Sequence, residues 1–506
     1  MRKTVAVAAA LVAILGMLAP PVFAQAPAPK VTISGFVDNI SSWSHNLSTV
    51  DQNYARNGET EWYARTRVRP DITAEVGKTK FVLGLEIDST WGQTGATDIT
   101  APNRFGTSSS WDLNTDTLGN IELKWAYTEF DVPLIPWASR LRMGAQPFST
   151  TYKAAILATG DFAGLHWTTT FNPAVKGNLT YAAIEEESTG PRDGFVRGED
   201  YAIIASLEIT PIKGLDLRPI YAFASYDGIT SGSSRQGRGG VSNTTAFFPG
   251  GNTESRHTLG LDMKWSSGPW SLDPTVFYQF GDRTLTPGAP FTAVGREDQD
   301  RSAWLLDIRG GWRSGPLLLE AAFIYTSGNT AGEDVRDPNQ EINYYEPINT
   351  DTSYYATWAE IWALGIDYFN IMYAASGLNP GVAIGYDKYG LIRLGTRATY
   401  ALTPNFSLRA NLTGNWTAEA VDSSSTYSTA AGLTPGDGNG NSSYLGTEFD
   451  LGFTWRFAPG VALDLVGAYM WAGNALSYHL GGASGTVNGR DPQDVQAIAT
   501  RVRFSF

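Results

Sequence analysis

At 506 residues the chain is long enough for several ordinary domains, but 54 glycines, 12% aromatic side chains and only six methionines favour strands and turns over helices. The absence of cysteine excludes disulfides, thiolate metal sites, cysteine nucleophiles and a lipid-modified cysteine anchor. The formal net charge of −13 is acidic, so we expect no nucleic-acid partner.

Residues 1–24 have the pattern of a signal peptide. Arg2 and Lys3 give a basic start, residues 5–18 form an apolar run, and residues 22–24 form a small-x-small cleavage site. We expect residues 25–506 to be the exported protein, folded as a single domain. No later apolar run reaches the ~18 residues of a membrane-spanning helix, so a membrane crossing by this chain requires a closed β-barrel.

Two neighbouring segments, residues 60–76 and 80–88, alternate apolar with charged side chains. Successive side chains of a strand point to opposite faces, so Trp62 and Ile72 share one face and Phe81 continues it after the turn at Gly77. The pattern predicts a β-hairpin with one apolar face. Its charged face carries Arg65, Arg67, Arg69, Glu86 and Asp88.

The same alternation recurs along the chain, and short connections take turns with long polar ones. The short connections fall near 132–139, 172–173, 210–214, 266–269, 314–316, 403–405 and 458–460. The long polar stretches between them include residues 92–119, 227–255, 282–300, 418–445 and 473–494. This order is typical of an up-and-down antiparallel barrel that crosses a membrane, with short turns at one rim and long loops at the other. The segments predict an all-β transmembrane barrel of about 18 strands, with 16 as the alternative.

Aromatic residues at both ends of the segments, on the apolar face, test this prediction. Near the short turns they are Trp265, Trp270, Trp312, Tyr400, Phe406, Trp455, Phe457 and Phe506, and near the long loops Trp91, Tyr325, Trp416 and Trp471. A barrel in a membrane carries rings at both interfaces. A soluble sandwich or solenoid gives no reason for rings at both strand ends, so we favour the membrane barrel.

Two connections differ from the other polar loops. Residues 151–164 are more apolar than an exposed loop requires, with Lys153 and Asp161 as their only charges. This segment either narrows the lumen or caps the surface and contacts another subunit.

The second connection, residues 328–389, contains a stretch where strand alternation fails. Residues 357–377 have the three-four apolar spacing of a helix, and Thr357 with Glu360 forms a capping box. This helix either plugs or constricts the lumen, or packs at the rim or at a subunit interface. The residues assigned to this expected plug helix are Trp358, Glu360, Trp362 and Asp367.

Short stretches of the chain resemble a known family. The opening strand VTISGFVDN, the segments RVRP and RLRMGAQPF, and the terminal Phe506 resemble Gram-negative outer-membrane porins, most closely the homotrimeric porins of sulfate-reducing bacteria. The resemblance implies a homotrimer of water-filled barrels in outer-membrane lipid and lipopolysaccharide, with Phe506 as the insertion signal. General porins have sixteen strands, whereas eighteen looks more like the substrate-selective channels.

In a channel the side chains that face water act on the solute, and strand alternation identifies them. They either form a transverse field that orients solutes or are structural ion pairs. The candidate pore-lining residues are Arg65, Arg67, Arg69, Glu86, Asp88, Arg140, Arg142, Asp161, Arg393, Arg397, Arg409, Arg501 and Arg503.

We therefore predict a porin for passive diffusion of small hydrophilic solutes and ions, with no enzymatic activity and no cofactor. One alternative is a substrate-selective channel for anionic or carbohydrate solutes, and another is a structural or adhesive protein with a plugged barrel. A weak calcium candidate is the loop with Asp437, Asn439 and Asn441, because it has the alternating oxygen ligands of a calcium loop but lacks the later glycine and glutamate.

Overall fold

The computed structural model describes part of the chain. The described residues are 28–46, 60–91, 110–111, 121–153, 156–186, 199–227, 252–285, 297–333, 335, 339–350, 358–362, 388–421, 426–427, 440, 442–476, 478–481, 487–490 and 492–506. The predicted signal peptide, Asp367 and the calcium candidates Asp437, Asn439 and Asn441 lie outside them.

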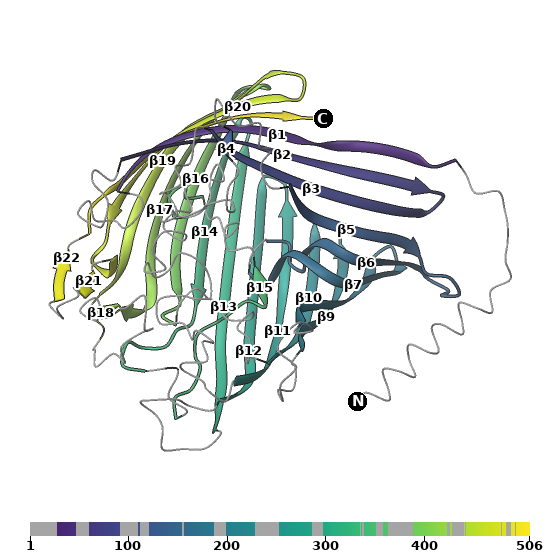
Figure 1. Ribbon diagram of the computed structural model, residues 1–506, viewed down its shortest axis with the longest axis horizontal. Helices are drawn as coiled ribbons and strands as arrows, with labels where there is room; N and C mark the ends of the chain where they lie inside the picture. The colour runs from purple at the N-terminus through teal and green to yellow at the C-terminus, as the bar shows by residue number, and fades with distance from the viewer. Residues whose placement is uncertain are drawn as a thin grey trace.

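Eighteen long strands form the body of the molecule (Figure 1). They are β1 (Lys30–His45), β2 (Thr60–Val76), β3 (Thr79–Trp91), β5 (Ile121–Asp131), β6 (Ala138–Ser149), β7 (Ala158–Asn172), β8 (Val175–Glu186), β9 (Glu199–Ile212), β10 (Leu215–Asp227), β11 (Asn252–Ser267), β12 (Trp270–Leu285), β13 (Glu297–Ser314), β14 (Leu317–Thr326), β16 (Leu391–Thr403), β17 (Phe406–Val421), β19 (Ser442–Ala458), β20 (Val461–Ala472) and β23 (Val495–Ser505).

Short elements lie in the connections. They are β4 (Ser110–Trp111), β15 (Asn349–Thr350), β18 (Thr426–Tyr427), β21 (Tyr478–Gly481), β22 (Val487–Arg490) and the 3-10 turn η4 (Asn474–Leu476). Among the described residues, no helix is long and apolar enough to cross a membrane.

The sheet closes on itself, because the last strand pairs with the first. Each long strand is antiparallel to the next, and β1 pairs with both β2 and β23. At the seam Asp38 lies opposite Arg503, and Phe506 exchanges two backbone hydrogen bonds with Gly35, at 2.9 and 3.0 Å. The predicted closed barrel of 18 strands is confirmed, and the alternative of 16 is wrong.

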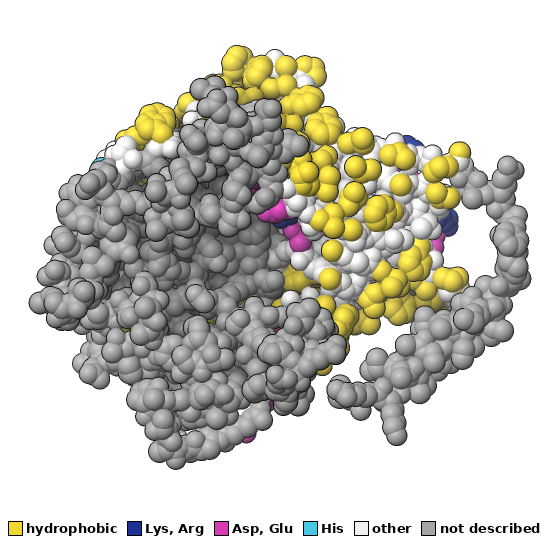
Figure 2. Space-filling view, viewed as in Figure 1, with side chains coloured by type: hydrophobic (Ala, Val, Ile, Leu, Met, Phe, Trp, Pro, Cys, Tyr) yellow, Lys and Arg dark blue, Asp and Glu magenta, His cyan; other side chains and the backbone are white. Residues whose placement is uncertain are grey.

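The two faces of the sheet have the composition that strand alternation predicts. On β2 the side chain of Trp62 is 75% exposed, whereas Arg65, three residues on, is fully buried. Hydrophobic side chains are scattered over the surface at the right of Figure 2, where Figure 1 draws β1–β3 and β5–β7. The long strands therefore present apolar side chains outward and most of their charged side chains inward, and exceptions such as Asp161 and Asp298 lie near strand ends.

Aromatic rings form the two expected belts on the outer face. Near the short turns the ring centroids of Trp270 and Trp312 lie 6.2 Å apart, and those of Trp455 and Phe457 5.3 Å apart. Toward the long connections, ring contacts run across neighbouring strands through Tyr181, Tyr201, Phe223, His257, Phe280, Tyr278 and Trp304.

The short turns depend on glycine in left-handed backbone conformations. Gly77 between β2 and β3 has a φ of 59°, and Gly268 between β11 and β12 has a φ of 56°. A side chain with a Cβ is disfavoured at such angles. The hairpin predicted at residues 60–88 is thus formed as expected.

Apolar side chains also fill part of the barrel interior. One cluster joins inward residues of β6–β10, β12–β14 and β16 to Ile156, Leu157, Tyr345 and Ile348 from two connections. A second cluster joins inward residues of β20 and β23 to Ala359, Ile361 and Trp362. Because chain segments pack against the inner wall, parts of the lumen are dry protein core.

Candidate functional site

The predicted basic ladder of β2 lies on the inner wall and is paired with carboxylates. Asp88 of β3 accepts hydrogen bonds from Arg65 at 2.8 Å and from Arg67 at 2.7 Å. Glu86 lies 2.9 Å from Arg67 and 3.0 Å from Arg69. Arg65 and Arg67 are buried, so this part of the ladder is a compensated ion-pair network and presents little charge to water.

Other predicted arginines reach the water of the lumen while pairing with a more buried carboxylate. Arg140 of β6 is 40% exposed and contacts Glu129, which is 13% exposed, at 2.7 Å. At the closing seam Arg503 is 33% exposed, whereas its partner Asp38 is fully buried. The same arrangement holds for Arg142 with Glu129, Arg397 with Glu320, Arg409 with Glu360 and Arg501 with Asp464.

Two of the predicted pore-lining residues, Arg393 and Asp161, have surroundings that differ from those of the water-exposed arginines. Arg393 is fully buried on β16, and its Nε donates to Asn415 Oδ1 at 2.5 Å. Asp161 does not lie in a loop, because β7 begins at Ala158. It shares the strand face of Ala163 and Leu165 and contacts Lys124 Nζ at 3.0 Å. The apolar composition of residues 158–164 is that of a barrel strand.

The described residues of the connection between β6 and β7, 150–153 and 156–157, pack inside the barrel. Its Tyr152 N–H donates to Asp262 Oδ2 on β11 at 2.5 Å, and Lys153 Nζ donates to the carbonyl of Asp273 on β12 at 2.8 Å. Arg218 of β10 lies 4.0 Å from the centroid of the Tyr152 ring. Burial lowers the pKa of Lys153, against the opposing effect of nearby carboxylates. We call residues 150–157 the short lumen loop.

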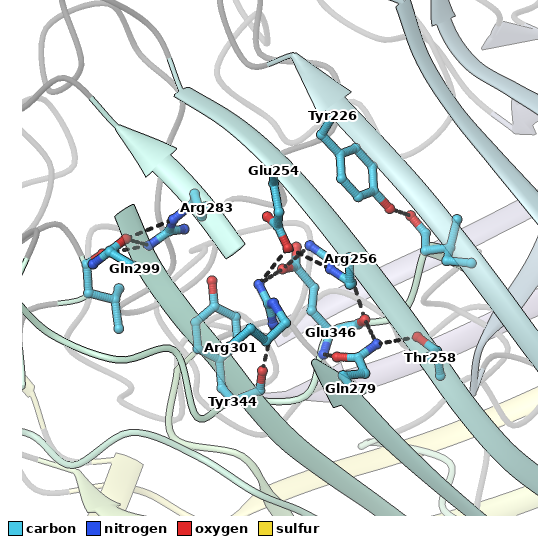
Figure 3. Close-up of polar contacts among 12 residues, drawn as sticks. Tyr226, Glu254, Arg256, Thr258, Gln279, Arg283, Gln299, Arg301, Tyr344 and Glu346 are labelled. Atoms are coloured by element: carbon cyan, nitrogen blue, oxygen red, sulfur yellow. Dashed lines mark hydrogen bonds and ion pairs between the residues drawn. The ribbon is translucent and has the colours of Figure 1, made fainter. Parts of the chain in front are cut away.

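The first described part of the long connection after β14, residues 327–333, 335 and 339–350, is attached to the wall formed by β11–β13 (Figure 3). Glu346 accepts from Arg256 at 2.7 Å and lies 3.4 Å from Arg301. Glu254 bridges the same two guanidinium groups, at 2.7 and 2.9 Å. Burial raises the pKa of the Tyr344 phenol beside this cluster. The four charges neutralise one another in a buried setting.

The two lumen connections also bind each other. Tyr345 Oη donates to the carbonyl of Ile156 at 2.7 Å, and the Ile348 N–H donates to Leu157 at 2.8 Å. Just beyond, β15 pairs in parallel with the start of β7, with Thr350 opposite Thr159. The short lumen loop and the first half of the long connection therefore form one block inside the barrel.

The later described part of the long connection, Trp358–Trp362, contacts another part of the wall. Glu448 of β19 accepts the N–H groups of Glu360, Ile361 and Trp362 at 2.6, 2.7 and 3.1 Å. These residues form a bend and a turn, and Trp358 has a φ of 51°. They are not helical, and the rest of the helix expected at 357–377 lies outside the described residues and stays a prediction.

Several residues of this lumen network were not expected from the sequence. Arg256, Arg283 and Arg301 lie in or next to stretches that look like polar loops, yet they belong to strands that continue beyond the apolar band. Strand alternation alone would have found Glu448 and Asp450, because both share the inward face of β19 with Gly452 and Thr454. Glu346 carries no local signal, since it lies in an irregular segment. Among the described residues no cluster of three or more His, Cys, Asp or Glu could hold a metal ion.

The closed sheet, apolar outside and charged inside, defines the class of a transmembrane β-barrel whose lumen is narrowed by its own connections. No protein-family model and no curated protein sequence matches the chain. Among solved structures, OpdQ of Pseudomonas aeruginosa is similar, with 11% identity, 94% of this chain and 98% of that chain covered, and a TM-score of 0.47. OccK8 (OprE) of Pseudomonas aeruginosa and a BenF-like porin from Pseudomonas fluorescens Pf-5 each share 10% identity over 94% of this chain and 98% of theirs, with a TM-score of 0.48. Likenesses this distant carry no argument about function.

Proposed function

We propose that this protein is an outer-membrane porin through which small hydrophilic solutes and ions diffuse passively. The single observation that carries the proposal is the reversal of polarity across one closed sheet. The outer face is apolar between two aromatic belts, which suits lipid, and the inner face carries ion pairs whose guanidinium groups reach water. Residues 1–24 would direct export, and Phe506 would serve as the insertion signal.

We further propose that the channel prefers anions, which favours the substrate-selective alternative. The guanidinium is more exposed than its carboxylate partner in the pairs of Arg142, Arg397, Arg409, Arg501 and Arg503 and in the pair of Arg140 with Glu129. The pairs of Arg218 with Glu208, of Lys124 with Asp161, and of Arg256 and Arg301 with Glu254 have the opposite arrangement. Since Arg256, Arg301 and Glu254 are almost closed to water, the paired side chain that water reaches is more often the positive one. A wall of one sign raises the local concentration of counter-ions.

Planar-bilayer recording tests both proposals. We expect discrete conductance steps from the purified protein in detergent, and a reversal potential in a salt gradient that has the sign of anion preference. The absence of steps would contradict the porin and favour a plugged structural protein. Conductance steps with cation preference would contradict the proposed anion preference but not the proposed porin.

The environment of the barrel follows from the same surface. We propose that outer-membrane lipid and lipopolysaccharide contact the apolar band and the aromatic belts, and that the barrel assembles as a homotrimer, as the sequence resemblance implies. Chemical cross-linking in native membranes tests the assembly, because a ladder ending at three chains is expected.

A further inference from the structure

Glu448 makes an unusual set of contacts inside the barrel. Its carboxylate is fully buried on the inward face of β19 and receives three consecutive backbone N–H groups, from Glu360, Ile361 and Trp362. Consecutive N–H groups that converge in a turn form an anion-binding nest. Hydrogen bonds to an ionised acceptor are about twice as strong as neutral ones, so this carboxylate holds the turn firmly.

Side chains of the same turn add to this attachment. Glu360 contacts Arg409 of β17 at 2.7 Å. Thr413 of β17 donates to the carbonyl of Trp358 at 3.4 Å. Ile361 and Trp362 are buried in an apolar cluster with inward residues of β20 and β23. The turn therefore lies flat against the inner wall.

The long connection is attached on opposite sides of the lumen. Thr350 pairs with Thr159 of β7, and Trp358, eight residues later, contacts β16 and β17. Among the 18 barrel strands β7 is the sixth and β17 the fifteenth, so they are nine strand positions apart, half of the circumference. Eight extended residues span at most ~28 Å, which is the largest distance that can separate the two attachments.

We infer that Glu448 is the positioning residue of a constriction and that Trp358 is the side chain it places in the passage. Trp358 is partly exposed, whereas Ala359, Glu360, Ile361 and Trp362 are buried. Its ring lies 4.7 Å from the guanidinium carbon of Arg397, one of the water-exposed arginines. The indole thus narrows the passage and covers part of a cationic side chain. This inference rests on the proposed channel function.

For solutes the consequence is a size limit that is set by the Trp358 indole, which Glu448 keeps in place. When Glu448 is replaced by Gln, the negative charge disappears. The amide oxygen can still accept from the N–H groups of Glu360 and Ile361, but the amide NH₂ group then faces the N–H of Trp362 and cannot accept its hydrogen bond. The turn then loses its strongest attachment and Trp358 leaves its place. Loss of the ring alone, in Trp358→Ala, widens the passage without moving the turn.

The experiment compares Glu448→Gln with a matched variant, Asp216→Asn. This variant neutralises an inward carboxylate on β10 that accepts a hydrogen bond from Thr210 near the short-turn rim. Each is combined with Ile361→Cys, because the chain has no cysteine of its own and Ile361 is buried. We expect a thiol reagent to label the introduced cysteine at least about tenfold faster with Glu448→Gln than with Asp216→Asn or in Ile361→Cys alone. This labelling does not depend on conduction.

Single-channel recording on the same proteins gives the second readout. We expect the conductance of Glu448→Gln and of Trp358→Ala to rise about twofold, and the double variant to match Trp358→Ala, because both act through one ring. Equal labelling rates with and without Glu448, or an unchanged conductance in Trp358→Ala, would overturn the inference while the wild-type steps remain. Fast labelling in a protein that never conducts would overturn the porin and leave the attachment by Glu448 standing. Should Glu448→Gln not fold, the conductance of Trp358→Ala decides.

Discussion

At the scale of single residues, the interior is organised by charges that are buried only in pairs or larger sets. Arg256 and Arg301 illustrate this, because each contacts both Glu254 and Glu346. A buried pair contributes little net stability over an apolar replacement, but removing one partner leaves an uncompensated charge. Such a set therefore fixes where the long connection lies more than it stabilises the barrel.

We predict that Glu346→Gln loosens this attachment. Two guanidinium groups would then share Glu254 alone, and we expect a loss of about 3 kcal/mol in the free energy of unfolding. Denaturant titration in detergent measures this change in the free energy of unfolding. The control is Glu341→Gln, which changes an exposed glutamate of the same connection, and an equal loss in that variant would refute the argument.

Sequence alternation placed the charged residues on the inner face but could not show which of them water reaches. Asp88 lies opposite Arg67 in the register of β2 and β3, so the prediction of a hairpin already contains that pair. The exposure of Arg503 compared with the burial of Arg65 depends on the chain segments that pack inside the barrel. Those segments are irregular, and a period-two pattern carries no information about them.

At the scale of elements, strands continue past the apolar band, and their ends were not predictable for that reason. The sequence suggested loops at 227–255 and 282–300, whereas β11 begins at Asn252, β12 continues to Leu285 and β13 begins at Glu297. Beyond the lipid, both faces of a strand meet water, so outward positions such as Thr253 and Asp298 are polar. Alternation then disappears although the hydrogen-bonded ladder continues.

Depth along a strand gives a prediction that compares two outward positions of β19. Leu451 is near the middle of the strand and Phe457 is beside the short turn, and both are about half exposed. Arginine on the lipid face costs ~2–4 kcal/mol at the midplane and ~0–1 near the interface. We expect Leu451→Arg to lower the unfolding free energy in lipid vesicles by that larger amount and Phe457→Arg by the smaller. Equal costs would contradict the assignment of the outer face to lipid.

At the scale of the whole molecule, the barrel depends on one seam between the two ends of the chain. The sequence predicted this closure, because a closed antiparallel barrel with an even number of strands places the last strand beside the first. The sequence could not predict the exact register of β1 with β23, because Asp38 and Arg503 are 465 residues apart. Pairing over such a separation carries a large entropic cost of closing the loop and forms late.

Deleting Phe506 tests the seam. The deletion removes two backbone hydrogen bonds to Gly35 and an outward ring that packs beside Phe504, with centroids 5.8 Å apart. We expect an unfolding free energy about 2 kcal/mol lower and a smaller folded fraction on an unheated gel. Phe506→Tyr keeps the backbone and the ring and serves as the control. Normal folding of the deletion would show that the terminal residue is dispensable.

The seam between β1 and β23 also determines what happens to a chain that lacks its last strand. A chain released early by the ribosome lacks β23 and so exposes two bare strand edges, one at each end of an open sheet, whose N–H and C=O groups have no water to bind within lipid. Only a sheet that contains both β1 and β23 hides both edges at once. Stable residence in lipid therefore depends on the last strand, because a sheet without it keeps two rows of unsatisfied backbone groups.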